Sequence, residues 1–247
     1  MSSLLVIQVA RALSAMRRHA NSLAESARGA EEHYVGVLSR IVKIVEARDK
    51  HTRGRSDRIG KLAELIARHM GKSEDVCHTL GLAGQLHDIG LLAISDNILG
   101  KRGTLRVDDY RTVQKHSEVS YEVLKPVTIL APLLPAIRHH HERMNGTGYP
   151  LGLTGEQIPL EARILAVADA YDAMTHDRPQ RPAMSPLETM RELRRCTPAG
   201  YDEACVNALA GIVNLEGIEA AMKSVEGPSA ELMEAGGVGG NARANLP

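Results

Sequence analysis

Residues 138–150 read Arg-His-His-His-Glu-Arg-Met-Asn-Gly-Thr-Gly-Tyr-Pro, and the rest of the chain is interpreted outward from them. The first half carries three consecutive histidines, more than an ordinary surface segment would hold. In the second half, glycine permits a positive φ and proline fixes φ, which is the composition of a shaped turn. The stretch therefore predicts metal ligands at a helix end that runs into a loop.

Two further clusters flank this stretch. Leu-His-Asp-Ile-Gly at residues 86–90 precedes it, and Ala-Asp-Ala-Tyr-Asp-Ala at residues 168–173 follows it. Asp88 and Asp169 lie among apolar neighbours, where a carboxylate costs free energy unless it is paired or bound to a cation. Neutral nitrogen ligands are offered by His87, His116, His140 and His141. A nitrogen and carboxylate set without thiolate suits iron, manganese or zinc.

The spacing of these ligands favours a cluster of metal ions over one compact mononuclear cage. Neighbouring helical residues point about 100° apart, so His87 and Asp88 suit a shared site, as do His140 and His141. A carboxylate between two metals with a bridging water is an arrangement of two-metal hydrolases, in which the metals activate the water and polarise phosphoryl oxygens. His139 is expected to be an ordinary structural histidine.

Composition predicts an all-α fold. The chain has 247 residues, 43% of them hydrophobic, with no Trp, no Phe and 6 Tyr, so the core must be aliphatic. The alternation that a sheet needs is nearly absent. Acidic and basic residues balance at 30 each, which argues against a nucleic-acid surface. Three scattered cysteines predict reduced thiols in a cytoplasmic protein, and no apolar run reaches the roughly 18 residues of a membrane span.

Helical periodicity divides the chain into three parts. Residues 1–33 are expected to form an N-terminal helix that packs on the domain, pairs in a homodimer or links to a sensory domain. Residues 34–225 are expected to form the main domain, and residues 226–247 a disordered tail, because this glycine-rich segment has no periodicity. Helices are expected at about residues 3–30, 34–47, 59–71, 73–86, 107–125, 129–141, 160–174, 186–194, 201–214 and 218–225.

Several motifs in one order resemble the HD-GYP family of cyclic di-GMP phosphodiesterases, within the HD phosphohydrolase superfamily. They cover about residues 34–225. In chain order they are Arg-Asp-Lys-His-Thr-Arg-Gly-Arg-Ser at residues 48–56, His87-Asp88-Ile89-Gly90, Lys115-His116-Ser117, His140-His141-Glu142 through Gly148-Tyr149-Pro150, residues 168–173, and Arg178-Pro179.

The resemblance implies a fold, a site and a reaction. The fold would be an HD-domain helical bundle with an added Gly-Tyr-Pro loop and C-terminal helices. The site would hold two or three divalent ions, iron or manganese before zinc. The reaction would open cyclic di-GMP to the linear dinucleotide by attack of a metal-bridging hydroxide, and some members of the family continue to GMP. The implied ligands are His87, Asp88, His116, His140, His141 and Asp169, with Asp88 bridging and with Asp88 and His87 catalytic. The implied substrate contacts are Arg178, Arg181, Tyr149 and Gly148.

The chain departs from the family pattern where chemistry is expected. Arg55 stands where the family has a histidine ligand, and a guanidinium cannot ligate a metal, so Arg55 is interpreted as a group that binds substrate phosphate. His51, one helical turn earlier, would share its face and is the candidate replacement ligand. Leu91 stands where the family has lysine. Asn145 and Gln180 replace a family aspartate and tyrosine.

These departures leave three functions open. The first is an active phosphodiesterase. The second is a catalytically degenerate module that binds cyclic di-GMP or signalling partners such as diguanylate cyclases. The third is a hydrolase of another phosphoester, because HD enzymes vary in substrate.

Overall fold

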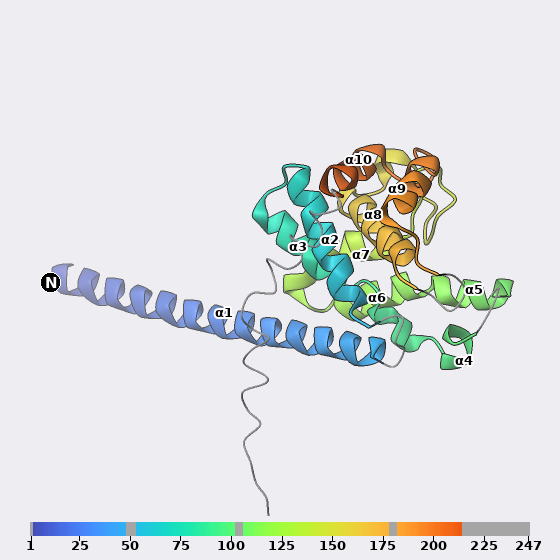
Figure 1. Ribbon diagram of the computed structural model, residues 1–247. Coiled ribbons are helices and arrows are strands. Elements are labelled where there is room, and N and C mark those ends of the chain that lie inside the picture. Colours follow the sequence, from blue (N-terminus) through green and yellow to red (C-terminus); the bar gives the residue numbers. More distant parts are fainter. Residues whose placement is uncertain (1, 48–52, 102–105, 178–181, 214–247) are drawn as a thin grey trace, which may run out of the picture.

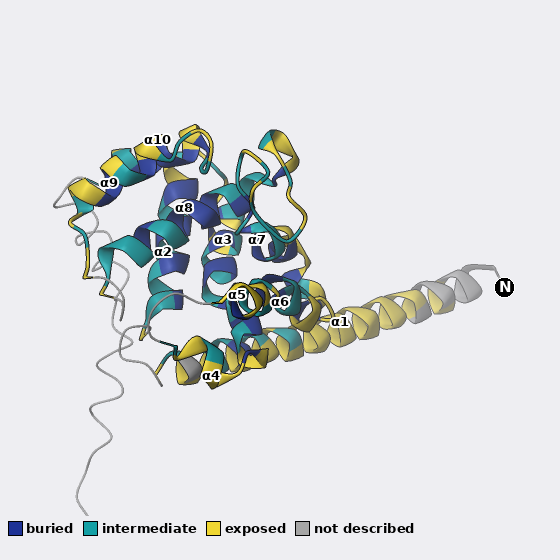
Figure 2. Cartoon of the chain, turned by 90° about the vertical axis from the view of Figure 1, so that its right-hand side faces the viewer, coloured by how far each residue is buried: buried dark blue, intermediate teal, exposed yellow. Residues whose placement is uncertain are grey.

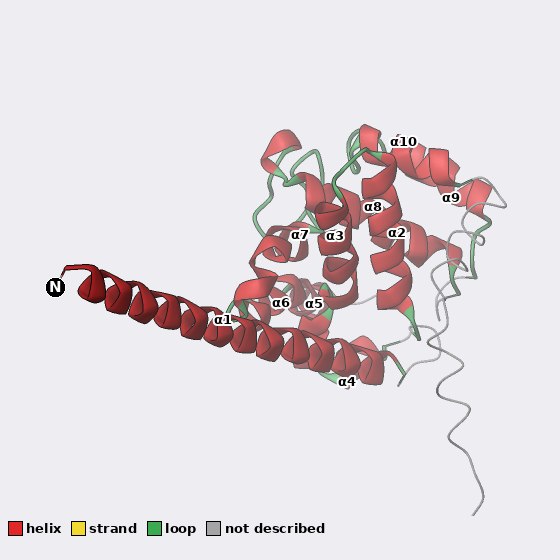
Figure 3. Ribbon diagram, turned by 90° about the vertical axis from the view of Figure 1, so that its left-hand side faces the viewer, coloured by secondary structure: helices red, strands yellow, loops and turns green. Residues whose placement is uncertain are grey.

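The computed structural model describes residues 2–47, 53–101, 106–177 and 182–213. In these residues helices are joined by loops, and the only β pairing is the isolated bridge between Asn145 and Thr154 (Figures 1 and 3). The α-helices are α1 (Ser2–Glu46), α2 (Arg55–His69), α3 (Glu74–Leu86), α4 (Asp96–Leu99), α5 (Val107–Gln114), α6 (His116–Leu124), α7 (Leu134–His139), α8 (Leu160–Thr175), α9 (Pro186–Arg195) and α10 (Glu203–Ile212). Short 3₁₀ helices are η1 (Ile89–Ala93), η2 (Thr128–Leu133) and η3 (Gly155–Gln157). The predicted all-α class is confirmed.

Helix α8 is the buried centre of the bundle, and Figure 2 shows it in dark blue between the surrounding helices. It contacts α2, α3, α7, α9 and α10. Its buried side chains include Ile164, Leu165 and Val167, all small or aliphatic, as the composition predicted. Because α8 is buried on several sides, a charged residue on it, such as Asp169, must find its counter-ion inside the protein.

Helices α2 and α3 cross at very close range through glycines. A Cβ atom on Gly84 would lie 2.4 Å from the Cα atom of Gly60, so neither position leaves room for a side chain. Ser73 caps α3, its hydroxyl accepting from the Val76 amide. The crossing fixes the end of α3, which carries His87 and Asp88.

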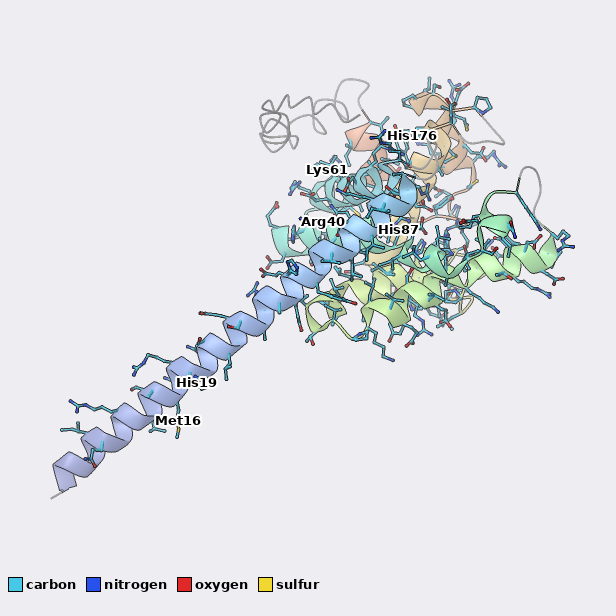
Figure 4. All side chains as sticks on the ribbon, turned by 90° about the horizontal axis from the view of Figure 1, so that it is seen from below. Met16, His19, Arg40, Lys61, His87 and His176 are labelled. Carbon is cyan, nitrogen blue, oxygen red and sulfur yellow. The ribbon has the colours of Figure 1, made fainter. Side chains whose placement is uncertain are left out.

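Helix α1 is one continuous helix, which corrects the prediction of two helices separated near residues 30–34. The segment contains no proline, and Gly29 and Gly36 weaken a helix without ending it, so the helix runs through. Its C-terminal part packs on the bundle through Leu38 and Val42. Its N-terminal part projects beyond the bundle, and Figure 4 labels Met16 on this part.

Two other predicted helices are divided. The segment expected over residues 107–125 is split at Lys115 into α5 and α6, where the Val113 carbonyl accepts a side-chain hydrogen bond from His116. The segment expected over residues 129–141 is η2 followed by α7, since Pro132 lies within η2. The helix expected at 218–225 and the tail at 226–247 lie outside the described residues. No described helix is both long enough and apolar enough to cross a membrane.

The close contact of α2 and α3 at Gly60 and Gly84 predicts that no larger residue is tolerated at either position. Gly84→Ala should lower the free energy of unfolding by roughly 1–3 kcal/mol, because the added methyl group overlaps backbone atoms of α2. Chemical denaturation of the purified chain measures this. The control Gly36→Ala, on exposed α1, should leave stability unchanged or raise it by up to about 1 kcal/mol. Equal stability of the wild type and Gly84→Ala would contradict the packing described here.

Candidate metal centre

Four segments that are distant in sequence converge on one buried site. The end of α3 supplies His87 and Asp88, the start of α6 supplies His116, and α8 supplies Asp169. His140 and His141 follow the last residue of α7. His87, which is labelled in Figure 4, lies within the bundle and is 1% exposed, while His140 is fully buried. Residues 138–150 thus meet both of the flanking sequence clusters, 86–90 and 168–173.

Three of these histidines are oriented in the same way. The Nδ1 atoms of His87, His116 and His140 lie 2.7, 2.7 and 2.6 Å from the carbonyl oxygens of Gly84, Val113 and Ile137, each three residues earlier. A carbonyl only accepts, so each Nδ1 carries the proton that it donates. The Nε2 atoms are therefore the ones that point into the site, as in histidine metal ligands whose other nitrogen is fixed by a hydrogen bond.

One group of side chains has the arrangement of a metal site. Ligand atoms of Asp88, His116, His140 and His141 all lie within 4.8 Å of one another. The Nε2 atoms of His116 and His140 face each other at 3.5 Å. Two nitrogens whose protons are held elsewhere cannot hydrogen-bond to each other, so a cation between them would relieve the contact. The residues present therefore fit a divalent metal ion.

Asp88 lies between two halves of the site. One half holds His116, His140 and His141, and the other holds His87, Asp169 and Arg55. The Oδ1 atom of Asp88 is 3.3 Å from His116 Nε2. Its Oδ2 atom is 3.0 Å from His87 Nε2 and 3.6 Å from Arg55 Nε. Among the described residues, His87 Nε2 is buried without a hydrogen-bond partner despite that short distance. The carboxylate thus faces imidazole nitrogens on both sides, the geometry expected of the bridging ligand.

Arg55 is the first residue of α2, and its side chain lies in the half of the site that holds His87 and Asp169. Its guanidinium forms a short ion pair with Asp169 and lies 3.7 Å from Asp172 Oδ2. Asp172 also pairs with Arg58. The Nε and Nη2 atoms of Arg58 donate hydrogen bonds to the two carboxylate oxygens of Asp172 at 2.6 and 3.2 Å. The buried carboxylates therefore have cationic partners supplied by the protein itself.

The electrostatic environment favours the protonation states in which His140, His141, Asp88 and Asp169 can bind a metal ion: neutral imidazole and ionised carboxylate. Burial, together with the neighbouring imidazoles, holds the pKa of His140 and of His141 well below the usual value, so both stay neutral. Burial would raise the pKa of Asp88, but His87, His116 and Arg55 outweigh it and hold that pKa well below its usual range. Arg55 likewise outweighs burial and lowers the pKa of Asp169.

The pKa of His87 shows that the surrounding carboxylates favour positive charge at this position. Burial lowers its pKa, but the adjacent Asp88 and the nearby Asp169 outweigh burial and raise it. A cation at His87 Nε2 is therefore stabilised, whether that cation is a proton or a metal ion that replaces it.

The loop after the histidines forms a wall of the site. The Tyr149 ring stacks on His141, with ring centroids 4.7 Å apart. The Tyr149 amide donates to the His141 carbonyl at 3.2 Å. Gly148 approaches the backbone so closely that a Cβ atom would lie 2.4 Å from the Arg143 nitrogen. Glycine before the tyrosine is therefore a packing requirement that brings the aromatic ring against the ligands.

Glu142 is a residue whose role the sequence analysis missed. It is 2% exposed, and its carboxylate accepts from the backbone amides of Leu151 and Leu153 at 2.7 and 3.0 Å. It therefore ties the loop to the histidine segment. The signal was a charged residue directly after His140 and His141, at the entrance to a glycine-rich turn. Asp172 and Arg58 were not identified as a buried pair either.

The predicted site residues fall into two sets. The structure brings together His87, Asp88, His116, His140, His141, Asp169, Arg55, Gly148 and Tyr149. His51, Arg178 and Arg181 lie outside the described residues. His139 is not in the cluster, and its Nδ1 lies 3.9 Å from Glu142. The individual roles assigned to all these residues stay predictions.

The fold and site together define an all-α protein with a buried histidine–aspartate centre suited to a divalent ion. The family model described as HD domain matches residues 39–205. The chain belongs to the HD domain family, and the predicted resemblance is confirmed.

Named relatives support the same branch of the family. The chain is 39% identical over 202 residues to the cyclic di-GMP phosphodiesterase response regulator RpfG of Xanthomonas campestris pv. campestris, covering 81% of this chain and 52% of RpfG. It is 35% identical over 179 residues to the 3'3'-cGAMP-specific phosphodiesterase 3 of Vibrio cholerae, covering 72% of this chain and 39% of that protein. The chain thus spans about half the length of these relatives or less.

A solved structure shares the fold. Bd1817, a HDG"Y"P protein from Bdellovibrio bacteriovorus, matches with a TM-score of 0.55 at 17% identity, covering 74% of this chain and 63% of that one. At this identity the likeness concerns the arrangement of helices, and it supports the HD-type bundle.

The position of Glu142 predicts that it holds the loop. Glu142→Ala should lower the free energy of unfolding by about 1–3 kcal/mol, because two backbone amides lose a charged acceptor. Denaturation in urea measures this change. Glu156→Ala removes an exposed carboxylate from the same loop and should have no comparable effect. Equal losses in the two variants would show that the Glu142 contacts do not hold the loop.

Proposed function

We propose that this chain is a metal-dependent phosphodiesterase that hydrolyses cyclic dinucleotides, with cyclic di-GMP as the substrate. The observation that carries the proposal is the group of three imidazoles and one carboxylate, with its ligand atoms within 4.8 Å of one another. Relatives named as cyclic di-GMP and 3'3'-cGAMP phosphodiesterases support this chemistry and this substrate class.

The metal would be held by Asp88, His116, His140 and His141. Three nitrogens and one oxygen suit iron(II), manganese(II) or zinc. When bound, the ion supplies a lowered pKa for water and polarisation of the phosphoryl oxygens. The fixed Nδ1 hydrogen bonds of His116 and His140 keep their rings in place, so little rearrangement is needed when the ion enters.

The surrounding residues would bind and orient the nucleotide. Tyr149, stacked on His141, would present its aromatic ring to the substrate. Burial raises the pKa of Tyr149, so its hydroxyl stays protonated and can donate a hydrogen bond. Arg178 and Arg181, by resemblance, would meet the phosphates or guanines. The proposed products are the linear dinucleotide and GMP.

A second candidate is a binding module without turnover. One specific observation favours it: Arg55 faces Asp88, Asp169 and Asp172, and so draws on carboxylates that a cluster of two or three ions would use. In this case the chain would bind cyclic di-GMP, a diguanylate cyclase or another signalling partner, or a second copy of itself through α1.

Substitution of one histidine separates the two functions. The protein, prepared anaerobically and loaded with Mn(II) or Fe(II), is incubated with cyclic di-GMP and with 3'3'-cGAMP, and products are followed by chromatography. His140→Ala should lower turnover by more than roughly 100-fold, since even residues that only support metal ligands cost 10–100-fold. The neighbouring His139→Ala, which leaves the cluster intact, is the matched control and should retain metal and turnover.

Undiminished turnover in His140→Ala would contradict the metal-dependent mechanism. Absence of turnover in the wild type, together with tight binding of either nucleotide, would favour the binding module. Turnover of 3'3'-cGAMP in preference to cyclic di-GMP would correct the substrate and leave the reaction class in place.

A further inference from the structure

We infer that the Arg55 side chain is a built-in cation that fills the Asp88–Asp169 half of the centre, so that the chain binds a single divalent ion, in the half formed by Asp88, His116, His140 and His141. This inference deepens the proposed function and rests on the same metal centre. It replaces the cluster of two or three ions that the sequence predicts with one metal ion beside one guanidinium.

The contacts of Arg55 place its charge where a second ion would have to lie. The guanidinium pairs with Asp169 Oδ1, and its Nε atom is 3.6 Å from Asp88 Oδ2. These oxygens, with His87 Nε2 at 3.0 Å from Asp88 Oδ2, are the donor atoms of that half of the centre. A guanidinium has no lone pair to offer a metal. It therefore competes with an ion for these oxygens and adds repulsion between like charges.

The burial of Arg55 makes this arrangement stable. Its side chain is 16% exposed, and Asp169 and Asp88 are 14% and 17% exposed. A guanidinium stays charged in proteins, and Arg55 has Asp169, Asp88 and Asp172 around it as partners. Moving it out of the site would leave Asp169, on the buried helix α8, without its guanidinium partner, which is costly.

The charge balance also favours one ion. The site holds three carboxylates, on Asp88, Asp169 and Asp172, and two guanidiniums, on Arg55 and Arg58. These carboxylates and guanidiniums together leave one negative charge. One divalent ion brings the total to one positive charge, whereas two ions would bring it to three positive charges in a buried space.

Each oxygen of Asp88 faces a different cation, Arg55 on one side and the proposed metal ion on the other. Oδ2 faces Arg55 and His87, while Oδ1 faces His116 at 3.3 Å. Asp88 thus still bridges two positive charges, but one of them belongs to the protein. Arg55 would then stabilise negative charge next to the metal as a permanently placed group.

The experiment measures bound metal without any substrate. Wild type, Arg55→His and Arg163→His are loaded with excess Mn(II), freed of unbound ion by gel filtration, and analysed for manganese per chain by plasma mass spectrometry. Arg55→His removes the guanidinium and adds a nitrogen ligand. The control Arg163→His removes an arginine of similar exposure, 18%, that pairs with Asp202 outside the centre. The expected ratios are one ion for wild type, two for Arg55→His and one for Arg163→His.

Electron paramagnetic resonance of the same samples gives a second readout. Wild type should show the hyperfine pattern of isolated Mn(II), and Arg55→His that of an exchange-coupled pair. Arg55→Gln, which removes the charge and keeps a polar side chain, serves if Arg55→His fails to fold. If neither variant folds, the wild-type spectrum and ratio decide alone.

The outcomes separate this inference from the proposed function. Two coupled ions in the wild type, or one ion in a folded Arg55→His, would overturn the inference and leave the phosphodiesterase in place. One isolated ion in a wild type that hydrolyses neither cyclic dinucleotide would support the inference and contradict the proposed reaction. No bound manganese in any sample would overturn both.

Discussion

Buried negative charge that must be neutralised inside the bundle is the constraint on which the centre depends. Asp88 follows the end of α3, and Asp169 lies on the buried helix α8. Their side chains are only 17% and 14% exposed, so water cannot fully solvate either carboxylate. The protein answers with two devices. Arg55 and Arg58 enter from α2, and the imidazoles of His87, His116 and His140 are fixed by carbonyl hydrogen bonds so that their free nitrogens face inward. The packed helices, the contact between Gly60 and Gly84, and the loop tied to Glu142 keep these arginine, aspartate and histidine side chains in position.

Much of this could be predicted from sequence because the signals are local. The helical class followed from periodicity and from the absence of Phe and Trp. His87 with Asp88, and His140 with His141, stood out because polar ligands sat beside apolar helix residues. Their convergence with His116 and Asp169 was predicted through the family resemblance, since no spacing rule links segments so far apart in the chain.

What the sequence could not supply concerns orientation and continuity. The length of α1 was missed because its apolar pattern weakens around residue 30, although no residue there stops a helix. Glu142 was overlooked because its role depends on where the loop folds back onto it. The interpretation of Arg55 as a phosphate ligand stays a prediction. That Arg55 also faces three carboxylates could not be foreseen, because it depends on the placement of α2 against α8.

The central claim is that the histidine–aspartate half of this centre binds a metal ion while Arg55 keeps its place in the other half. Crystals of the wild-type chain grown with Mn(II) test it most directly, through an anomalous difference map collected near the manganese edge. The account predicts one peak, enclosed by Asp88, His116, His140 and His141, with the Arg55 guanidinium still between Asp88 and Asp169. A peak between Asp88 and Asp169 with Arg55 displaced, or no peak within the centre, would contradict it.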